Sequence, residues 1–331
     1  MPSAYGAAEL VIPILKQGGG RAEAVMRGGT MAMAQAVAPG TFHDSTLTSP
    51  LLASGLPRLA KSEAVPALQA FLNARSKPFL FDTVPSEGAF AEALQDSAAR
   101  VFVLQSWRRA GLEIKGSFEE WLADNFDHKR RKELKRLRSR LSELGDLKLE
   151  TLNQNSTLNG FVDDLLELES AGWKGKRGTA LKNSPGVAAA FREAMAGLQA
   201  AGKLRFWRLA LDGKPIAILY AMVDGDEAWL GKIAYDEAWA KFSPGTLLIL
   251  DATESFFAEG GIRRVDSSAI PGHPMIDRVW RDRIGFQDVL VAGENVTPLG
   301  FWLVARGLLV KRHVRGLLKS AFYALTRRKR S

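Results

Sequence analysis

Three apolar segments separated by two Asp-Gly pairs are the feature of this sequence that most restricts its fold. The segments are 204–211, 215–223 and 227–235, and the pairs are Asp212-Gly213 and Asp224-Gly225. Asp-Gly favours a tight hairpin, because glycine accepts a positive φ without steric cost. The pattern therefore predicts an antiparallel meander of three strands.

Helices and strands are predicted to alternate on both sides of this meander. The C-terminal half is predicted to contain strands at 147–152, 263–269 and 286–292, and helices at 158–170, 186–200, 244–258 and 275–284. The N-terminal part is predicted to contain helices at 65–73 and 88–98 and strands at 78–84 and 100–106. This order is typical of an α/β protein with two lobes.

Composition excludes several kinds of site. The chain has no cysteine, which excludes disulfides, thiolate metal sites and a cysteine nucleophile and fits a reducing cytosol. Its four histidines are scattered, so we expect no metal site. Residues 1–20 lack the pattern of a secretory signal, and no uncharged apolar run reaches the roughly 18 residues of a membrane span. We therefore expect a cytoplasmic protein.

The net charge of +9 is confined to the C-terminal tail. From Arg306 onward the chain carries nine Lys and Arg residues and no Asp or Glu, and its other 36 basic residues equal the 36 acidic ones. A nucleic-acid-binding body would carry its own basic surface, so we do not expect nucleic acid as a partner.

Two interpretations of residues 298–331 stay open. Apolar residues recur at helical spacing on one side of this tail: Val310, Val314, Leu317, Leu318, Ala321, Phe322 and Leu325. Cations cluster on the other side: Lys311, Arg312, Arg315 and Lys319. This pattern is typical of an interfacial helix, which would hold the protein peripherally on the anionic inner membrane surface. Alternatively, the helix packs on the body and ends in a disordered segment at 327–330.

A basic helix is predicted at 117–146. Ser117 can cap its start, and Leu134, Leu137 and Leu141 recur on one face while Lys and Arg residues cover the others. The helix is either a solvated amphipathic element or a basic rim that attracts an anionic cofactor or substrate.

The segment 241–248 joins the meander to the next helix and is the strongest candidate for a binding site. Ser243 is a suitable N-cap and Pro244 fits the first helical position. Three amides would point out of the helix start without partners, those of Gly245, Thr246 and Leu247. Such a helix start binds anions, and Lys241 could add charge. An ordinary capped helix is the alternative interpretation.

The order of meander, glycine-containing turn, helix and strand resembles the acyl-CoA site of GNAT N-acyltransferases. The resemblance covers about residues 120–293 and is strongest to the BioF2-like or CelD-like acetyltransferase domain, which is related to the FemABX group. It is carried by the Ser-Pro-Gly helix start and by 169–181 (ESAGWKGKRGTAL) and 266–283 (DSSAIPGHPMIDRVWRDR). The chain departs from the wider GNAT phosphate loop, Arg/Gln-x-x-Gly-x-Gly/Ala, because it offers only Ser-Pro-Gly-Thr.

The resemblance implies an α/β (α+β) GNAT-type acyltransferase fold with a mixed sheet. Residues 1–116 would form an N-terminal lobe, a degenerate copy of the GNAT unit as in tandem relatives. Residues 117–146 would connect it to the full GNAT domain at 147–293, and 294–331 would be the basic amphipathic tail.

The implied activity is transfer of an acyl group, here acetyl from acetyl-CoA, to an amine of a small or envelope-related acceptor. CelD-like relatives are associated with exopolysaccharide production. Two alternatives stay open. The donor is aminoacyl-tRNA with a peptidoglycan-type acceptor, as in FemABX relatives, or the protein is a membrane-associated accessory factor whose GNAT site has decayed.

The resemblance also assigns site residues. The helix start at Ser243, Gly245, Thr246 and Leu247, with Lys241, would bind the pyrophosphate, and the pantetheine would run along the strand at Ile233 and Ala234. Asp266 is the first candidate base, His273 the second, and Tyr235 the candidate proton donor. Each also has a structural interpretation: a turn cap, a hydrogen-bonding histidine and a core tyrosine. Four residues would bind the acceptor: Trp173, Lys174, Arg177 and Arg281.

Overall fold

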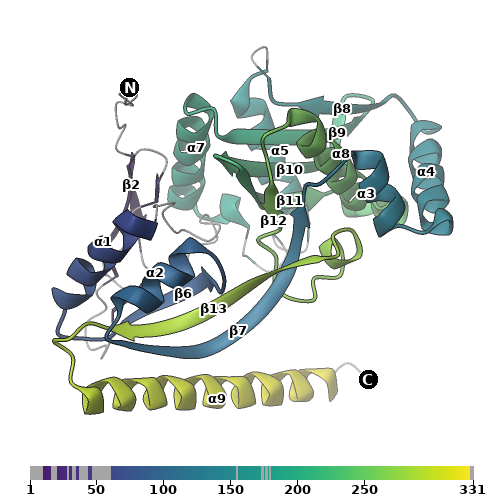
Figure 1. Cartoon of the computed structure of the whole chain (residues 1–331). Coiled ribbons are helices and arrows are strands. Elements are labelled where there is room, and N and C mark those ends of the chain that lie inside the picture. Colours follow the sequence, from purple (N-terminus) through teal and green to yellow (C-terminus); the bar gives the residue numbers. More distant parts are fainter. Residues whose placement is uncertain are drawn as a thin grey trace, which may run out of the picture. The chain divides into compact units, whose positions relative to one another are not determined.

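The computed structural model describes residues 10–15, 21–27, 30–31, 35–36, 44–46, 61–153, 156–172, 175, 178 and 180–328. The chain forms two compact units (Figure 1). The first comprises Met1–Trp107 and Gly285–Ser331, and the second comprises Arg108–Ile284. The second unit is therefore inserted in the chain between the two parts of the first.

The first unit contains a mixed sheet with the strand order β1-β2-β4-β5-β6-β13-β7, with β3 beside β2. The strands are β1 (Leu10–Leu15), β2 (Arg21–Arg27), β3 (Thr30–Met31), β4 (Gln35–Ala36), β5 (Asp44–Thr46), β6 (Phe79–Pro85), β7 (Arg100–Glu113) and β13 (Asp282–Ala292). β7 and β13 each also contribute residues to the second unit. β6 pairs in parallel with β5 and antiparallel with β13.

Alternating side chains of β6 and β13 are buried on opposite faces of this sheet. Phe79 and Phe81 pack with α1 (Lys61–Asn73) and α2 (Ala89–Ser97). Leu80 and its β13 partner Leu290 pack instead with α9 (Pro298–Arg328). The period of two along a strand thus builds two small cores, one on each face.

The second unit contains a sheet with the order β7-β12-β11-β10-β9-β8. Its further strands are β8 (Leu147–Thr151), β9 (Leu204–Leu211), β10 (Lys214–Asp224), β11 (Glu227–Tyr235) and β12 (Arg264–Asp266). The predicted meander is confirmed, because β9, β10 and β11 pair antiparallel. Asp212 and Gly213 both have positive φ, 48° and 72°, as a tight hairpin requires.

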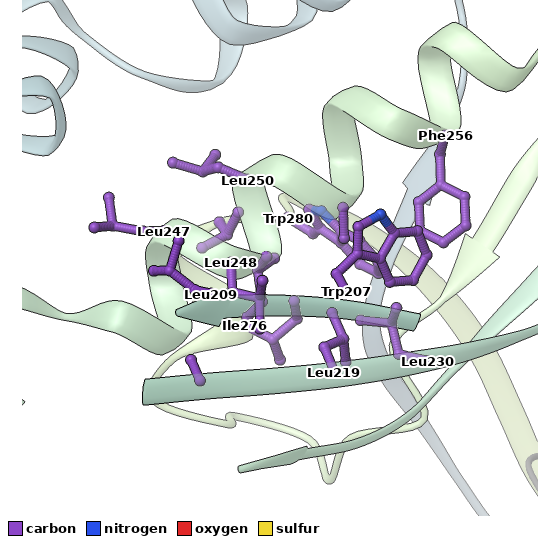
Figure 2. Close-up of a cluster of buried hydrophobic side chains, with 14 of the residues drawn as sticks. Trp207, Leu209, Leu219, Leu230, Leu247, Leu248, Leu250, Phe256, Ile276 and Trp280 are labelled. Carbon is purple, nitrogen blue, oxygen red and sulfur yellow. The ribbon is translucent and has the colours of Figure 1, made fainter. Parts of the chain in front are cut away.

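Helices cover both faces of this second sheet. α5 (Leu158–Ala171) and α7 (Pro185–Ala200) lie on one face, where aromatic rings of the helices meet rings of β9 and β10. α3 (Phe118–Asn125), α4 (His128–Ser142) and α8 (Pro244–Glu259) lie on the other. Figure 2 shows the core there, in which Trp207 and Leu209 of β9 meet Leu248 of α8.

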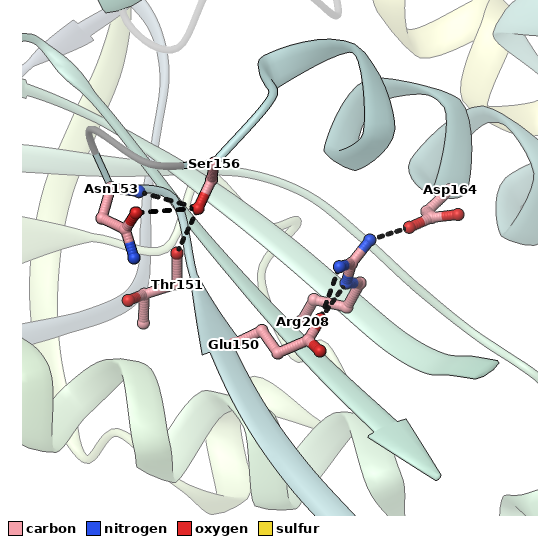
Figure 3. A network of polar contacts seen from close by, with 6 residues as sticks. All are labelled: Glu150, Thr151, Asn153, Ser156, Asp164 and Arg208. Atoms are coloured by element: carbon pink, nitrogen blue, oxygen red, sulfur yellow. Dashed lines mark hydrogen bonds and ion pairs between the residues drawn. The ribbon is translucent and has the colours of Figure 1, made fainter. Parts of the chain in front are cut away.

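Arg208 joins the outer strands to α5, as Figure 3 shows. Its Nε donates to Glu150 of β8 at 2.6 Å, and its Nη1 donates to Asp164 of α5. Its guanidinium carbon also lies 4.5 Å from the centre of the Phe161 ring. These contacts hold the edge of the sheet against the helix.

Several predicted elements differ from the structure. The strand predicted at 100–106 continues to Glu113 as β7. The single helix at 117–146 is two helices, α3 and α4, because Asp127 caps a new start by accepting the Arg130 amide. The helix predicted at 275–284 is only a short 3₁₀ turn, η3 (Ile276–Arg278), followed by β13. The chain turns there because Trp280 is fully buried and donates to Thr253 Oγ1 at 3.0 Å.

The strand predicted at 263–269 is also shorter than expected, since β12 ends at Asp266. Ser268 then adopts a left-handed backbone with φ 51°, which ends the extended conformation.

Candidate functional site

Helix α8 begins where the sequence predicts, but its start is built differently. Ser243 has φ 53° and ψ 49°, and its side chain makes no capping hydrogen bond. Its carbonyl accepts the amides of Thr246 at 2.9 Å and Leu247 at 3.1 Å. The prediction of three unpartnered amides is therefore wrong for these two, because the tight first turn uses them. Of the three, only the Gly245 amide makes no hydrogen bond within the described part of the chain.

A cleft of about 220 Å³ opens at this helix start. Its lining comes from α4, the end of β11, the first turn of α8 and the loop before η3: Arg130, Tyr235, Ala240, Ser243, Pro244, Gly245, Thr246, Pro274, Met275 and Arg278. Leu247 instead points into the core, where it is 1% exposed. The cleft is thus large enough to receive part of a small-molecule ligand next to the helix start.

Two arginines supply the positive charge of this cleft. Arg130 comes from α4 and also contacts Glu133 at 2.8 Å, and Arg278 comes from η3. Lys241 does not line the cleft, and its ammonium lies 5.0 Å from the centre of the Phe242 ring. Arginine pairs with phosphate through two parallel hydrogen bonds, so this lining suits a phosphorylated ligand.

Strand β11 is paired differently along its two edges. Towards β10 it is paired over most of its length. Towards β12, pairing in the described residues is confined to Glu227, Ala228 and Trp229. The stretch from Leu230 to Tyr235, which includes the predicted contacts Ile233 and Ala234, therefore has no ladder partner on that side. An extended ligand could add to such an edge through backbone hydrogen bonds.

A β-bulge interrupts β11 in the middle of this stretch. Leu219 pairs with Ile233 and Ala221 pairs with Leu230, so two β11 residues lie opposite Tyr220. One of them is Gly231, where an added Cβ would come within 2.1 Å of the Tyr220 ring. The bulge thus depends on glycine, and such features re-aim neighbouring side chains.

The other bulge residue, Lys232, forms a buried ion pair with Glu169 of α5. Their charged atoms lie 2.8 Å apart, and the two side chains are 16% and 1% exposed. Glu169 also accepts the Leu181 amide at 2.9 Å. Burial first, and the Glu169 charge second, raise the pKa of Tyr220 above its usual value. The neighbourhood is therefore strongly polar although it is enclosed.

Glu169 lines a second, smaller pocket of about 40 Å³ on the α5 side of the sheet. Its walls are Leu168, Glu169, Gly172, Ile233, Ala234, Tyr235 and Glu237. Tyr235, which is 36% exposed, lines this pocket and the cleft at α8. The end of β11 thus separates a cationic cleft from a pocket that holds a buried carboxylate.

Both carboxylate oxygens of Asp266, the first candidate base, accept hydrogen bonds from other residues of the protein. Arg109 Nε donates to its Oδ1 at 2.8 Å, Arg109 Nη2 donates to its Oδ2, and the Ser268 amide donates to Oδ1 at 2.9 Å. The Asp266 side chain is 6% exposed. These contacts favour the turn-forming interpretation, in which Asp266 holds the end of β12.

His273, the second candidate base, accepts hydrogen bonds at Nδ1. The donors are the amides of Met275 and Ile276, at 3.3 and 3.4 Å. A neutral imidazole that accepts at Nδ1 carries its proton on Nε2 and donates from there. In this geometry His273 suits a hydrogen-bond donor better than a base.

Of the four predicted acceptor residues, the structure describes only Arg281. Trp173, Lys174 and Arg177 lie outside the described residues. Arg281 is exposed and donates to the Asp124 carbonyl at 3.3 Å. In the described chain, no three His, Asp or Glu side chains gather as they would around a metal ion.

Sequence reasoning missed Glu169, Lys232 and Arg278. Glu169 opens the motif ESAGWKGKRGTAL, but its role depends on the bulge that brings Lys232 against it. A strand lysine and a helix glutamate 63 positions apart leave no local pattern. Arg130 belongs to the predicted basic rim, and its place in the cleft agrees with the interpretation as an anion-attracting surface.

Comparison with known proteins identifies the fold. Residues 128–272 match the family model described as the acetyltransferase (GNAT) domain. The structure of FemX has a TM-score of 0.52 and 10% identity, over 88% of this chain and 89% of that one. A conserved protein of unknown function from Bacteroides thetaiotaomicron VPI-5482 has a TM-score of 0.51 and 10% identity, over 82% and 86%. At these identities the likeness shows the fold alone.

No curated protein sequence matches the chain. The predicted GNAT-type α/β fold with a mixed sheet is confirmed by the family match and by the FemX structure. The proposed origin of the N-terminal lobe as a degenerate GNAT unit stays a prediction.

Proposed function

Because the chain carries a GNAT acyltransferase domain in a fold related to that of FemX, we propose that it moves an acetyl group from acetyl-CoA to an amine of an envelope-related acceptor. The observation that carries this proposal is the arrangement around Tyr235. On one side lies a cleft with two arginines and a helix start, and on the other a pocket with a buried carboxylate.

The donor would occupy the cleft and the open edge of β11. The diphosphate would be bound by the guanidinium groups of Arg130 and Arg278 and by the backbone amide of Gly245. Phosphate groups favour such cations and the backbone N–H groups at a helix N-terminus. The pantetheine would extend along Leu230–Tyr235, where the edge of β11 that faces β12 has no strand partner among the described residues. This path leads the thioester towards Tyr235 and the Glu169 pocket.

The acceptor amine would enter the pocket at Glu169. Glu169, whose carboxylate lies 2.8 Å from the Lys232 ammonium, would bind the ammonium group of the acceptor and take its proton. The free amine nitrogen then attacks the thioester carbonyl carbon, so the C–N bond forms and the C–S bond breaks. The nitrogen loses its second proton in this step, and that proton would replace the one that Tyr235 gives up. Tyr235 would donate a proton to the leaving thiolate. Lys232 would position Glu169, and Asp266 with Arg109 would position the β12 turn.

The donor is tested by calorimetric titration of the protein with CoA and acetyl-CoA. We expect the wild type to bind acetyl-CoA and Arg130→Gln and Arg278→Gln each to bind about tenfold more weakly, because each loses a charge-assisted contact worth about 1.4 kcal/mol. Lys241→Gln is the matched control, since Lys241 lies outside the cleft. Absence of binding by any CoA ester would favour the aminoacyl-tRNA donor or a decayed site.

The acceptor side is tested with Glu169→Gln in an acetyl-transfer assay over a panel of amines. We expect kcat to fall about 100-fold, as for loss of a general base, while acetyl-CoA affinity stays within about twofold. Glu167→Gln on the same helix is the control, because Glu167 is 64% exposed and pairs only with surface Lys182 in the described chain. Equal kcat for wild type and Glu169→Gln would exclude Glu169 as the base.

A further inference from the structure

Helix α9 packs on the first unit with one side only. Phe301, Ala305 and Leu308 are buried in the core on that side. Arg312, one turn after Leu308, contacts the buried Asp288 at 2.7 Å. These contacts set the rotation of the helix about its axis, so they also determine which side faces away from the sheet.

The side facing away from the sheet is apolar and exposed. We name it the apolar stripe, and its members are between 46% and 71% exposed: Leu299, Leu303, Val310, Val314 and Leu317. Their spacings of three, four and seven residues keep them on one side of the helix for a length of about 27 Å. Monomeric proteins in water seldom expose this many large apolar side chains along one side of a helix, so the stripe needs an occupant.

The charges around the stripe are all positive. Arg306 and Lys311 are exposed within or beside it, Arg315 is exposed on another side of the helix, and Arg312 is half-buried at Asp288. From Arg306 to the end of the sequence no Asp or Glu occurs. The structure does not describe the side chains of residues 319–328 or any part of residues 329–331. All charged residues in these ranges are Lys or Arg. An occupant must therefore be both apolar and anionic.

We propose that the apolar stripe of α9 docks on an anionic lipid surface, with the helix lying in the plane of the headgroups. Trp302, 48% exposed, packs edge-on against Phe102 and Phe301 and would sit at the headgroup level. No helix in the described residues is long and apolar enough to cross a membrane. Two copies of α9 would face each other with like charges, which disfavours self-association.

The proposal resolves the two interpretations of the tail without depending on acyl transfer. The helix packs on the body through the Phe301 side and presents a second apolar side outward. Helix α4 provides the comparison for charge alone. It is also rich in Lys and Arg, but its Leu134 and Leu141 are buried in the core.

The test is flotation of the full chain with vesicles of phosphatidylcholine, with and without phosphatidylglycerol. We expect binding only to the mixed vesicles. Leu303→Asp combined with Val310→Asp should lower the partition coefficient at least about tenfold, because two inserted side chains are lost. Arg306→Glu combined with Lys311→Glu, the exposed cations within or beside the stripe, should lower it by a similar factor, at roughly 1 kcal/mol per charge.

The matched control is Lys135→Glu combined with Arg136→Glu on α4, which reverses two exposed charges and should leave flotation unchanged. An equal loss in this control would assign the binding to charge alone and overturn the role of the stripe. Unchanged flotation of the Leu303/Val310 variant would overturn it too. Circular dichroism and the melting temperature of each variant show whether it is folded.

The competing occupants give different results in the same set of variants. A second copy predicts a dimer of the wild type by light scattering that Leu303→Asp/Val310→Asp converts to a monomer, with no vesicle binding. A nucleic acid predicts oligonucleotide binding that responds to Arg306→Glu/Lys311→Glu but not to the apolar substitutions. Either result would replace the lipid proposal.

Discussion

The tripeptide Ser-Pro-Gly begins two helices of this protein, and of the two starts the one at α8 lines a cleft formed by described residues. Both helices, α7 and α8, have 16 residues and carry proline in the first turn. At α7 the tripeptide is exposed, and Ser184 is extended with φ −125°. At α8 Ser243 is left-handed, and Pro244 and Gly245 are buried.

The difference comes from the residues before the tripeptide. Each start follows a short 3₁₀ turn, η1 (Leu181–Asn183) or η2 (Glu237–Phe242). Asn183 is exposed, whereas Phe242 is buried in the main core. One serine connects the turn to the helix at both starts, so the length of the connection does not distinguish them. The left-handed serine goes with the start whose preceding turn is anchored in the core by Phe242. The tripeptide thus specifies a helix start, and its surroundings decide whether that start can bind a ligand.

The difference between the two helix starts is tested most directly by substituting glutamate for the glycine of each tripeptide, Gly245 and Gly186. Gly245→Glu should weaken acetyl-CoA binding at least about 30-fold, or 2 kcal/mol, because it adds a negative charge to the cleft. Its Cβ would also lie 3.0 Å from Met275 Sδ and 3.3 Å from Tyr235 Cδ1. Gly186→Glu meets nothing within 4 Å and should change the affinity less than about twofold. Equal effects in a calorimetric titration would remove the helix start from the proposed site.

The next largest difference is expected at the ion pair of each helix. Asp251 of α8 pairs with Arg138, and these side chains are 10% and 38% exposed. Arg192 of α7 pairs with Asp163, and these side chains are 43% and 56% exposed. Arg138→Met should destabilise the fold by about 2 kcal/mol in urea unfolding, because it leaves a buried carboxylate uncompensated. Arg192→Met should cost less than about 0.5 kcal/mol.

The Asp251 pair also predicts a pH dependence. Burial raises the pKa of Asp251, and Arg138 lowers it. The folded state therefore holds this proton more tightly than the unfolded chain, so stability falls as pH rises through the folded pKa. Without Arg138 this fall should be larger and extend to higher pH, and Asp251→Asn in the Arg138→Met background should abolish the difference. Parallel pH–stability curves of wild type and Arg138→Met would refute this account.

The smallest effect is expected at the two serines. Ser243→Gly should stabilise the fold by about 1 kcal/mol, since glycine adopts the left-handed conformation without the penalty of a Cβ. Ser184→Gly should destabilise it by about 0.5 kcal/mol. Ser184 is extended and unstrained, so glycine there only increases the conformational entropy of the unfolded chain. A loss of stability in Ser243→Gly would mean that its hydroxyl makes a contact that outweighs the backbone conformation.

Local patterns were enough to predict the meander and most helices of the second unit. The strands at 204–211 and 227–235 have the predicted bounds, because Asp-Gly turns and apolar runs are short-range signals. The helix predicted at 275–284 failed because the burial of Trp280 under Thr253 is a tertiary effect. Periodicity along one segment carries no information about such a partner.

The site was predictable only where it coincides with a secondary-structure boundary. The α8 start and Tyr235 follow from the order of elements, and both line the cleft. Glu169, Lys232 and Arg278 depend on a bulge and on a turn, which long-range packing creates. Asp266 was chosen for its place after β12, but the sequence gives no sign that Arg109 occupies its carboxylate.

The insertion of the second unit into the first has a consequence for biosynthesis. A ribosome completes Arg108–Ile284 before it reaches Gly285, so the acyltransferase unit can fold while the chain is still being made. β6 must wait for β13, its antiparallel partner, and for α9, which covers one of its faces. A nascent chain halted before Gly285 should therefore leave Leu80, whose face α9 covers, in reach of chaperones, and translation of the last segment would end that exposure.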